Sequence, residues 1–389
     1  MNALIYLIQE QGDLEKFSME NQELQNNKEK PQKKHIHLVE ANKISASTGK
    51  NMIVRVLTAL VLLFICLPLS FVGSWGFFIL ILVLAFISIL EVSRAPKEKN
   101  IPIILYITFI IITLSFIYWY FIKNALNQYV YGEGNSIIAD LNFNFALFGV
   151  GFANSSGGIV EGLGISIIMV AFSFLIYFTA CITNENFTFK DVCYFFTMSI
   201  LIGIGFQSMY YVKYLPFSSE FIGSSIPYYD NGYGTYALST LLFIFVLIGC
   251  MMNDIGAYFV GVLFGKHKIN ERISPKKTWE GFVGGILIAT GLALVFAFSC
   301  SAGGCDLLPG VLDFEHWYNV VILAVGMPFI ANIGDFAFSA IKRNFGIKDF
   351  GNIIPGHGGV LDRLDSVLFT FIFVACLLTL MSNGWWFLN

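Results

Sequence analysis

The sequence predicts an all-α, polytopic integral membrane protein of about nine transmembrane helices, with the N-terminus inside the cell and the C-terminus outside. Three observations predict this fold class: the composition, the apolar stretches and the distribution of positive charge. Of the 389 residues, 56% are hydrophobic and 13% are charged, whereas a soluble domain carries about 25% charged residues. A single soluble core would not hide this much apolar surface, so we expect the bilayer to be the solvent.

Residues 1–51 are expected to form a disordered cytosolic tail. They are rich in Gln, Asn, Glu and Lys, a composition with too few apolar groups to offset the entropy of ordering. Within residues 1–51 no charged segment is followed directly by a long apolar run, so a cleaved signal peptide is not expected.

Nine apolar stretches follow the tail, most of them long enough to cross about 30 Å of hydrocarbon as helices. The predicted spans are 52–72, 75–93, 101–121, 163–183, 192–212, 236–262, 281–300, 317–340 and 362–382. Residues 52–250 are predicted to form an N-terminal transmembrane region, with outer loops at 122–162 and 213–235. Residues 251–389 are predicted to form a catalytic transmembrane region.

The basic residues support this topology. With the N-terminus inside, 21 of the 23 Lys and Arg residues fall on the cytosolic side, and only Lys123 and Lys213 fall outside. Cytosolic loops of membrane proteins are enriched in Lys and Arg. Moving one helix would invert every later loop and destroy the asymmetry.

A first polar cluster covers residues 253–281. Asp254 interrupts an apolar stretch, and ionisable residues inside membranes are costly and often functional. Glycines four residues apart, at 261 and 265 and at 281 and 285, favour close helix packing over a ligand site. Lys276 and Lys277 could neutralise a phosphate chain or face anionic lipid headgroups, and taken alone they favour the headgroups.

A second cluster lies at 332–343. Asn332, Asp335, Ser339 and Lys342 have the spacing of one helical face that ends at the cytosol. A polar face on a membrane helix must meet protein or water. The alternative is that Asp335 pairs with a neighbouring basic residue only for packing.

The third cluster, 348–366, places glycines around His357 and then two acids three residues apart, Asp362 and Asp365. Glycine lets the backbone approach phosphate closely; His357 either contacts phosphate or pins the loop. One acid at a helix start could simply complement the helix dipole, but that does not explain the second, one turn deeper. Paired carboxylates beside Lys and Arg suit a divalent cation and a polyphosphate.

One long run joins the second and third clusters. It consists of Ser339, Ile341, Lys342, Arg343, Lys348, Asp349, Gly351, Ile354, Pro355, His357, Gly358, Gly359, Val360, Asp362, Arg363, Leu364 and Asp365. This run resembles the complete signature of phosphatidate cytidylyltransferases, also called CDP-diacylglycerol synthases. Residues 253–258 and 274–281 are similar to further segments of that family. The resemblance covers about residues 52–389, is dense after residue 250 and leaves out the tail and the outer loops.

The resemblance implies transfer of CMP from CTP to phosphatidate, giving CDP-diacylglycerol and pyrophosphate for phospholipid biosynthesis. It implies Mg²⁺ as cofactor, with a second cation left open. Because CTP is cytosolic and the phosphatidate headgroup lies at the interface, we expect the active site at the cytosolic face, in a bacterial plasma (inner) membrane. Membrane lipids are expected partners, a homodimer is left open, and no nucleic acid is expected.

Roles follow for the individual residues. Asp335 and Asp362 are expected to bind Mg²⁺, with Asp365 and Asp254 as further ligands or anchors. The expected phosphate clamp is Lys342, Arg343, Lys348 and Arg363, with Lys276 and Lys277. His357 is the remaining catalytic candidate, and Ser339, Gly358 and Gly359 are candidates for binding substrate.

Two other functions compete with this one. A CTP-using transferase or kinase that acts on an isoprenoid lipid would need the same metal and phosphate ligands. A transporter could also explain carboxylates within the membrane, but it predicts polar residues in both halves of the bilayer. The clusters here crowd one interface.

Overall fold

The computed structural model describes residues 74–96, 101–132, 160–214, 234–354 and 358–382. Apart from loops and one antiparallel hairpin, these ranges are helical. The elements are α3 (Ser74–Ser93), α4 (Ile103–Gly132), α6 (Val160–Thr183), α7 (Phe189–Tyr214), α9 (Gly234–Phe264), β1 (Lys268–Asn270), β2 (Ser274–Thr278), α10 (Trp279–Ala302), α11 (Trp317–Asn344) and α12 (Leu361–Ser382).

Every predicted apolar stretch that falls in the described ranges is a helix. Six of these helices are long and apolar enough to cross a membrane, while the apolar parts of α4 and α6 are shorter, Ile103–Tyr118 and Met169–Thr183. The tail 1–51 and the stretch 52–72 lie outside the described residues, as does most of each predicted outer loop. One boundary was wrong: α4 continues to Gly132, past its predicted end at residue 121.

The hairpin between α9 and α10 departs from the all-α prediction. β1 and β2 pair antiparallel, with Lys268 opposite Thr278 and Asn270 opposite Ser274. The side chain of Asn270 forms the turn, accepting the backbone N–H of Arg272 at 3.1 Å. The two strands have only three and five residues, most of them polar. They leave no signal in hydropathy, so the sequence could not predict the hairpin.

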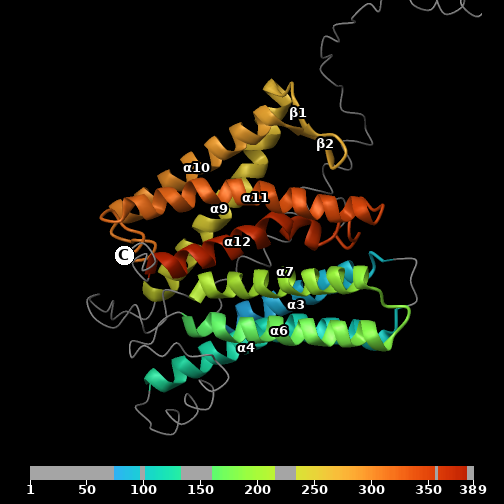
Figure 1. Cartoon of the computed structure of the whole chain (residues 1–389). Coiled ribbons are helices and arrows are strands. Elements are labelled where there is room, and N and C mark those ends of the chain that lie inside the picture. The colour runs from blue at the N-terminus through green and yellow to red at the C-terminus, as the bar shows by residue number, and fades with distance from the viewer. Residues whose placement is uncertain (1–73, 97–100, 133–159, 215–233, 355–357, 383–389) are drawn as a thin grey trace, which may run out of the picture. The chain divides into compact units, whose positions relative to one another are not determined.

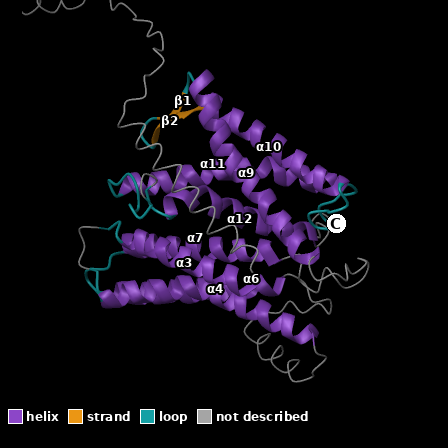
Figure 2. Ribbon diagram, turned by 180° about the vertical axis from the view of Figure 1, so that it is seen from behind, coloured by secondary structure: helices purple, strands orange, loops and turns teal. Residues whose placement is uncertain are grey.

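Helix α10 packs on α9 and α11, and α12 packs on α11 and α7 (Figures 1 and 2). Helix α9 runs across α11 and α12 and also contacts α7, which belongs to a group formed by α3, α4, α6 and α7. Aromatic side chains fill the latter group: Phe78 stacks on Phe121 with ring centroids 3.7 Å apart, and Phe109 meets Phe195 edge-on at 5.1 Å. By contrast, α9 and α10 expose large apolar side chains such as Leu263 and Leu287. Exposed apolar faces are what helices surrounded by lipid require.

Glycines let α9 and α10 pack closely, as predicted. A Cβ on Gly281 would lie 2.7 Å from the carbonyl oxygen of Ala257, and one on Gly285 would lie 2.7 Å from that of Asn253. Close backbone approach of this kind is a common form of helix association in membranes. It holds the segment that carries Asp254 against α10.

Helix α11 contains Pro328, which cannot donate a backbone hydrogen bond to the carbonyl of Ala324. The Thr290 hydroxyl of α10 donates to that carbonyl instead, at 3.1 Å. One turn later, Asn332 Nδ2 donates to the Pro328 carbonyl at 2.9 Å and to Asn253 Oδ1 of α9 at 3.0 Å. Hydrogen bonds from α10 and to α9 therefore hold the segment of α11 around Pro328, which lies just before Asp335.

Candidate active site

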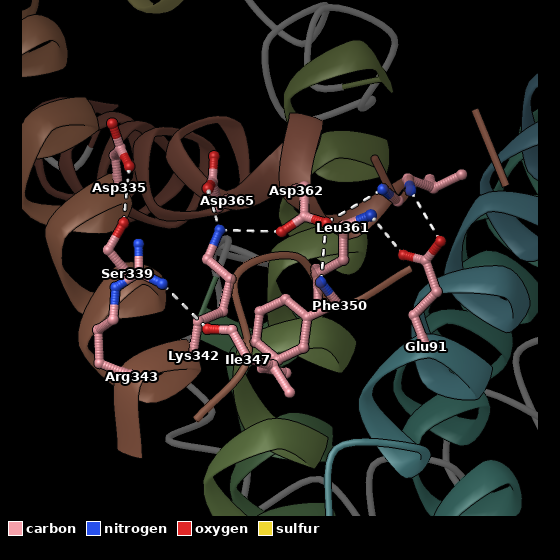
Figure 3. Close-up of polar contacts among 12 residues, drawn as sticks. Glu91, Asp335, Ser339, Lys342, Arg343, Ile347, Phe350, Leu361, Asp362 and Asp365 are labelled. Carbon is pink, nitrogen blue, oxygen red and sulfur yellow. Dashed lines mark hydrogen bonds and ion pairs between the residues drawn. The ribbon is translucent and has the colours of Figure 1, made fainter. Parts of the chain in front are cut away.

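Side chains of the second and third polar clusters meet in one place, with Glu91 of α3 beside them (Figure 3). The ends of α3 and α11, the start of α12 and the hairpin all contribute side chains that interact there. The structure thus brings the second and third clusters together, and it adds Lys277 from the first.

Lys342 lies at the centre of the site and is buried. Its Nζ donates to Asp362 Oδ1 at 2.9 Å and lies 3.8 Å from Asp365 Oδ2. The ring centroid of Phe350 is 5.6 Å from the same nitrogen. A buried ammonium group needs such partners, because leaving it unpaired would cost several kcal/mol. One lysine thus ties the last turn of α11 to both acids of α12.

Asp362 has the most enclosed side chain among the aspartates of the site, with 4% of it exposed. While Oδ1 accepts from Lys342, Oδ2 accepts the backbone N–H groups of Phe350 at 2.9 Å and Gly359 at 3.0 Å. Both carboxylate oxygens of Asp362 therefore already accept hydrogen bonds from the protein itself. Asp362 closes the glycine loop onto α12, a role that the sequence did not indicate.

Asp335 is more open, with 28% of its side chain exposed. Lys277 Nζ lies 2.5 Å from Oδ2, and the Ser339 hydroxyl donates to Oδ1 at 3.3 Å. Lys277 is half-buried, whereas its neighbour Lys276 is exposed. Lys277 thus faces a carboxylate, whereas the residues taken alone had favoured lipid headgroups for it.

Asp254 and Asp365 complete the acidic group. Asp254 interacts electrostatically with Asp335, and Asp365 interacts electrostatically with both Asp254 and Asp335. Asp365 is buried, whereas Asp254 is exposed although it lies about 15 Å before the end of α9. An exposed carboxylate this far into an apolar helix needs water or a counter-charge.

These residues suit a hard divalent cation in their chemistry. Carboxylate oxygens are the ligands such cations prefer, and Asp254, Asp335 and Asp365 act on one another. Among the described residues, however, no three His, Cys, Asp or Glu side chains are close enough to hold a metal ion as they stand. Lys277 and Lys342 neutralise the acids instead, so binding a cation would require the carboxylates to turn from their lysines.

The other basic candidates differ in exposure and in the hydrogen bonds that they make to the protein. Arg343 donates through Nε to the carbonyl of Ile273 at 3.3 Å and through Nη1 to that of Ile347 at 3.1 Å, so it secures the hairpin and the end of α11. Lys348 and Arg363 are exposed. Arg363 acts electrostatically on Asp254.

The glycines of the loop have mainly structural roles in this arrangement. Gly358 has a φ of 90°, which side chains on Cβ disfavour. The N–H of Gly359 donates to Asp362 and therefore does not point at a ligand. His357 lies outside the described residues, so both of its predicted roles stay predictions.

Glu91 of α3 belongs to the site, although no sequence motif includes it. Its side chain is fully buried, and its two oxygens accept the backbone N–H groups of Val360 and Leu361, each at 2.9 Å. The only sequence signal was a charged residue near the end of an otherwise apolar stretch. Its partners lie about 270 residues further along the chain, so periodicity could not find them.

The fold and the site define a polytopic α-helical membrane protein that gathers carboxylates, lysines and a glycine loop at one end of its helices. The sequence profile of the Cytidylyltransferase family matches residues 53–381. Because this match covers most of the chain, the chain belongs to the cytidylyltransferase family.

Individual relatives agree with the family match. The chain is 30% identical to a phosphatidate cytidylyltransferase of Bacillus subtilis over 328 residues, which cover 84% of this chain and 98% of that protein. It is 32% identical to the Staphylococcus saprophyticus phosphatidate cytidylyltransferase over 54% of this chain and 75% of the relative. A Mycobacterium leprae protein of the same name is 40% identical over 35% of this chain and 40% of its own length.

Proposed function

We propose that this chain is a phosphatidate cytidylyltransferase, which transfers CMP from CTP to phosphatidate and releases pyrophosphate. The similarity over nearly the whole length of the Bacillus subtilis relative carries the proposal. The acidic and basic side chains around Lys342 support it, because nucleotidyl transfer needs positive groups for the phosphates and oxygen ligands for a metal.

We assign Mg²⁺ to the carboxylates of Asp335, Asp254 and Asp365. Asp335 and Asp254 are the more open acids, and Asp365 lies beside them. Asp362 remains a weaker candidate for a direct ligand, because both of its oxygens already accept hydrogen bonds. When bound, the cation would neutralise phosphate charge and polarise the α-phosphorus of CTP.

The chain's own residues would position the two phosphate substrates. Lys276, Lys348 and Arg363 are exposed and are assigned to the triphosphate or the phosphatidate headgroup. Lys277 and Lys342 hold positive charge beside the carboxylates, where pyrophosphate would leave. Phosphatidate is already anionic, so its attack on the α-phosphorus requires no strong general base.

We place this reaction at the cytosolic face of a bacterial inner membrane. The helix ends that meet at the site are the ends that the positive-inside rule assigns to the cytosol, and CTP is available there. In this proposal residues 251–389 supply the reacting groups, residues 52–250 support them, and the tail 1–51 is cytosolic.

The test is to incubate the purified protein in detergent with phosphatidate, Mg²⁺ and CTP labelled at either the α- or the γ-phosphate. We expect the α label to appear in the lipid and the γ label in pyrophosphate. Transfer of the γ label to a lipid would instead identify a kinase, and label on an isoprenoid lipid but not on phosphatidate would identify a different transferase.

A further inference from the structure

We propose that Glu91 is a positioning residue, which acts through the glycine loop and the first turn of α12 to place Asp362 and Asp365. Its link to catalysis rests on the proposed function, whereas its effect on the loop does not. Among the described residues, the side chain of Glu91 accepts hydrogen bonds from Val360 and Leu361 and from none of the residues assigned to substrate or metal.

The start of α12 requires a hydrogen-bond acceptor. The first backbone N–H groups of a helix have no partner within the helix, and a residue of the same segment usually supplies one through its side chain. At the start of α12, the two carboxylate oxygens of Glu91, which belongs to another helix, accept the N–H groups of Val360 and Leu361. Its negative charge also complements the positive end of the helix dipole. A single side chain of α3 therefore holds the segment that directly precedes Asp362.

The loop is shaped to admit this carboxylate. A Cβ on Gly359 would lie 2.5 Å from Glu91 Oε2, and a Cβ on Gly351 would clash with Oε1. Atoms at such distances cannot coexist, so any side chain at these glycines would displace Glu91 or the loop. Both glycines belong to the run that suggested phosphate binding, and contact with Glu91 gives them a different role.

The end of α3 is itself held in place. The Tyr194 hydroxyl of α7 donates to the carbonyl of Val92 at 2.9 Å. The ring of Tyr194 also packs edge-on against Phe345, directly after α11, with centroids 4.6 Å apart. The backbone beside Glu91 is therefore hydrogen-bonded to α7 by a tyrosine that also packs against the end of α11, and a positioning residue requires such support.

Glu91 and Asp362 hold the loop from opposite sides. The N–H of Gly359 donates to Asp362, and the next two N–H groups along the chain donate to Glu91. If Glu91 released its side, Asp362 would shift with the loop, and Lys342 and Asp365 would shift with Asp362. A misplacement of about 1 Å can slow a reaction by about 10²-fold.

The test compares Glu91→Gln and Glu91→Asp with the matched control Ser88→Ala. Gln has the size of Glu but presents an NH₂ group to one of the two N–H donors, whereas Asp keeps the charge and both acceptors on a shorter chain. Ser88 is buried one turn earlier, and its hydroxyl donates only to its own helix, at the carbonyl of Leu84. All variants are purified as full-length, monodisperse protein in detergent.

The first readout is amide hydrogen exchange, which does not depend on activity. For Glu91→Gln we expect exchange at Val360 and Leu361 to rise at least about tenfold, with the remainder of α3 and α12 as in the wild type. The second readout is kinetic: we expect kcat per folded enzyme to fall at least about tenfold while KM for CTP and phosphatidate stays within about twofold. Glu91→Asp should recover part of kcat, and Ser88→Ala should match the wild type.

Unchanged exchange at Val360 and Leu361, or a kcat within twofold of the wild type in Glu91→Gln, would overturn the proposal. So would an increase in exchange throughout the protein, because that would indicate general destabilisation. If the wild type transfers no CMP at all, the proposed function fails, and the exchange experiment still decides whether Glu91 holds the loop.

Discussion

Lys342 is the buried cation on which both acids of α12 depend. The sequence placed it on the same helical face as Asp335, and the structure shows it paired with Asp362 and near Asp365. The face was predictable because it follows from helical periodicity. The pairing of Lys342 with Asp362 was not predictable. A loop separates the two residues in the chain, and its path depends on glycine conformations and on Glu91.

Replacing Lys342 by Gln should destabilise the protein strongly. Removing one partner of a buried ion pair leaves the other charge uncompensated and typically costs about 3–5 kcal/mol. The exposed Lys348→Gln is the control and should change the free energy of unfolding by less than about 0.5 kcal/mol. Reversible unfolding in mixed detergent measures both; equal stability of the two variants would contradict the structural role of Lys342.

Lys348→Gln should act on substrate binding instead. If Lys348 contacts a phosphate, its loss should raise KM for CTP or for phosphatidate by about tenfold, because a charge-assisted hydrogen bond contributes about 1.5–3 kcal/mol. Initial rates at varied concentrations of each substrate identify which one it holds. Unchanged KM values for both substrates would remove Lys348 from the site.

Hydropathy predicted the described helices, and glycine spacing predicted the packing of α9 on α10. Those features depend on local composition and on small residues at fixed intervals. The hairpin was missed because its short strands are polar. The cap of α12 was missed because its acceptor, Glu91, belongs to the N-terminal half of the chain, which carries no motif.

The packing of α9 on α10 predicts opposite effects for two glycines of α10. Gly285→Ala should lower the free energy of unfolding by about 1–3 kcal/mol, because the new Cβ would overlap the Asn253 carbonyl. At Gly291 a Cβ meets nothing within 4 Å among the described residues. Gly291→Ala should therefore stabilise by about 0.5–1 kcal/mol through helix propensity. Thermal unfolding of both in detergent tests this, and a loss of stability in Gly291→Ala alone would contradict the packing.

Both halves of the chain contribute residues to the site. Residues 251–389 carry the carboxylates and lysines, but α3 fixes the start of α12. The sequence predicted a catalytic region preceded by a region that was only apolar. Motifs identify residues that could react with a substrate, but they do not identify residues that hold those residues in place. Orientation in the membrane was predicted from charge counts alone.

Cysteine labelling tests that orientation. Cys305, which is exposed in the loop between α10 and α11, should react with a membrane-impermeant maleimide in intact cells. In a Cys305→Ser variant, a cysteine introduced by Asn270→Cys in the hairpin should react only after the cells are opened. The reverse pattern would place the site on the outer face, away from CTP.

We propose that the acidic group around Asp335 supports cytidylyl transfer. The most direct measurement is the initial rate of α-label incorporation into phosphatidate by Asp335→Asn, beside the wild type and Asp306→Asn, a control at the other end of α10. We expect Asp335→Asn to remain folded and to react at least about 10²-fold more slowly, with Asp306→Asn at the wild-type rate. A folded Asp335→Asn enzyme with near-normal turnover would contradict the account.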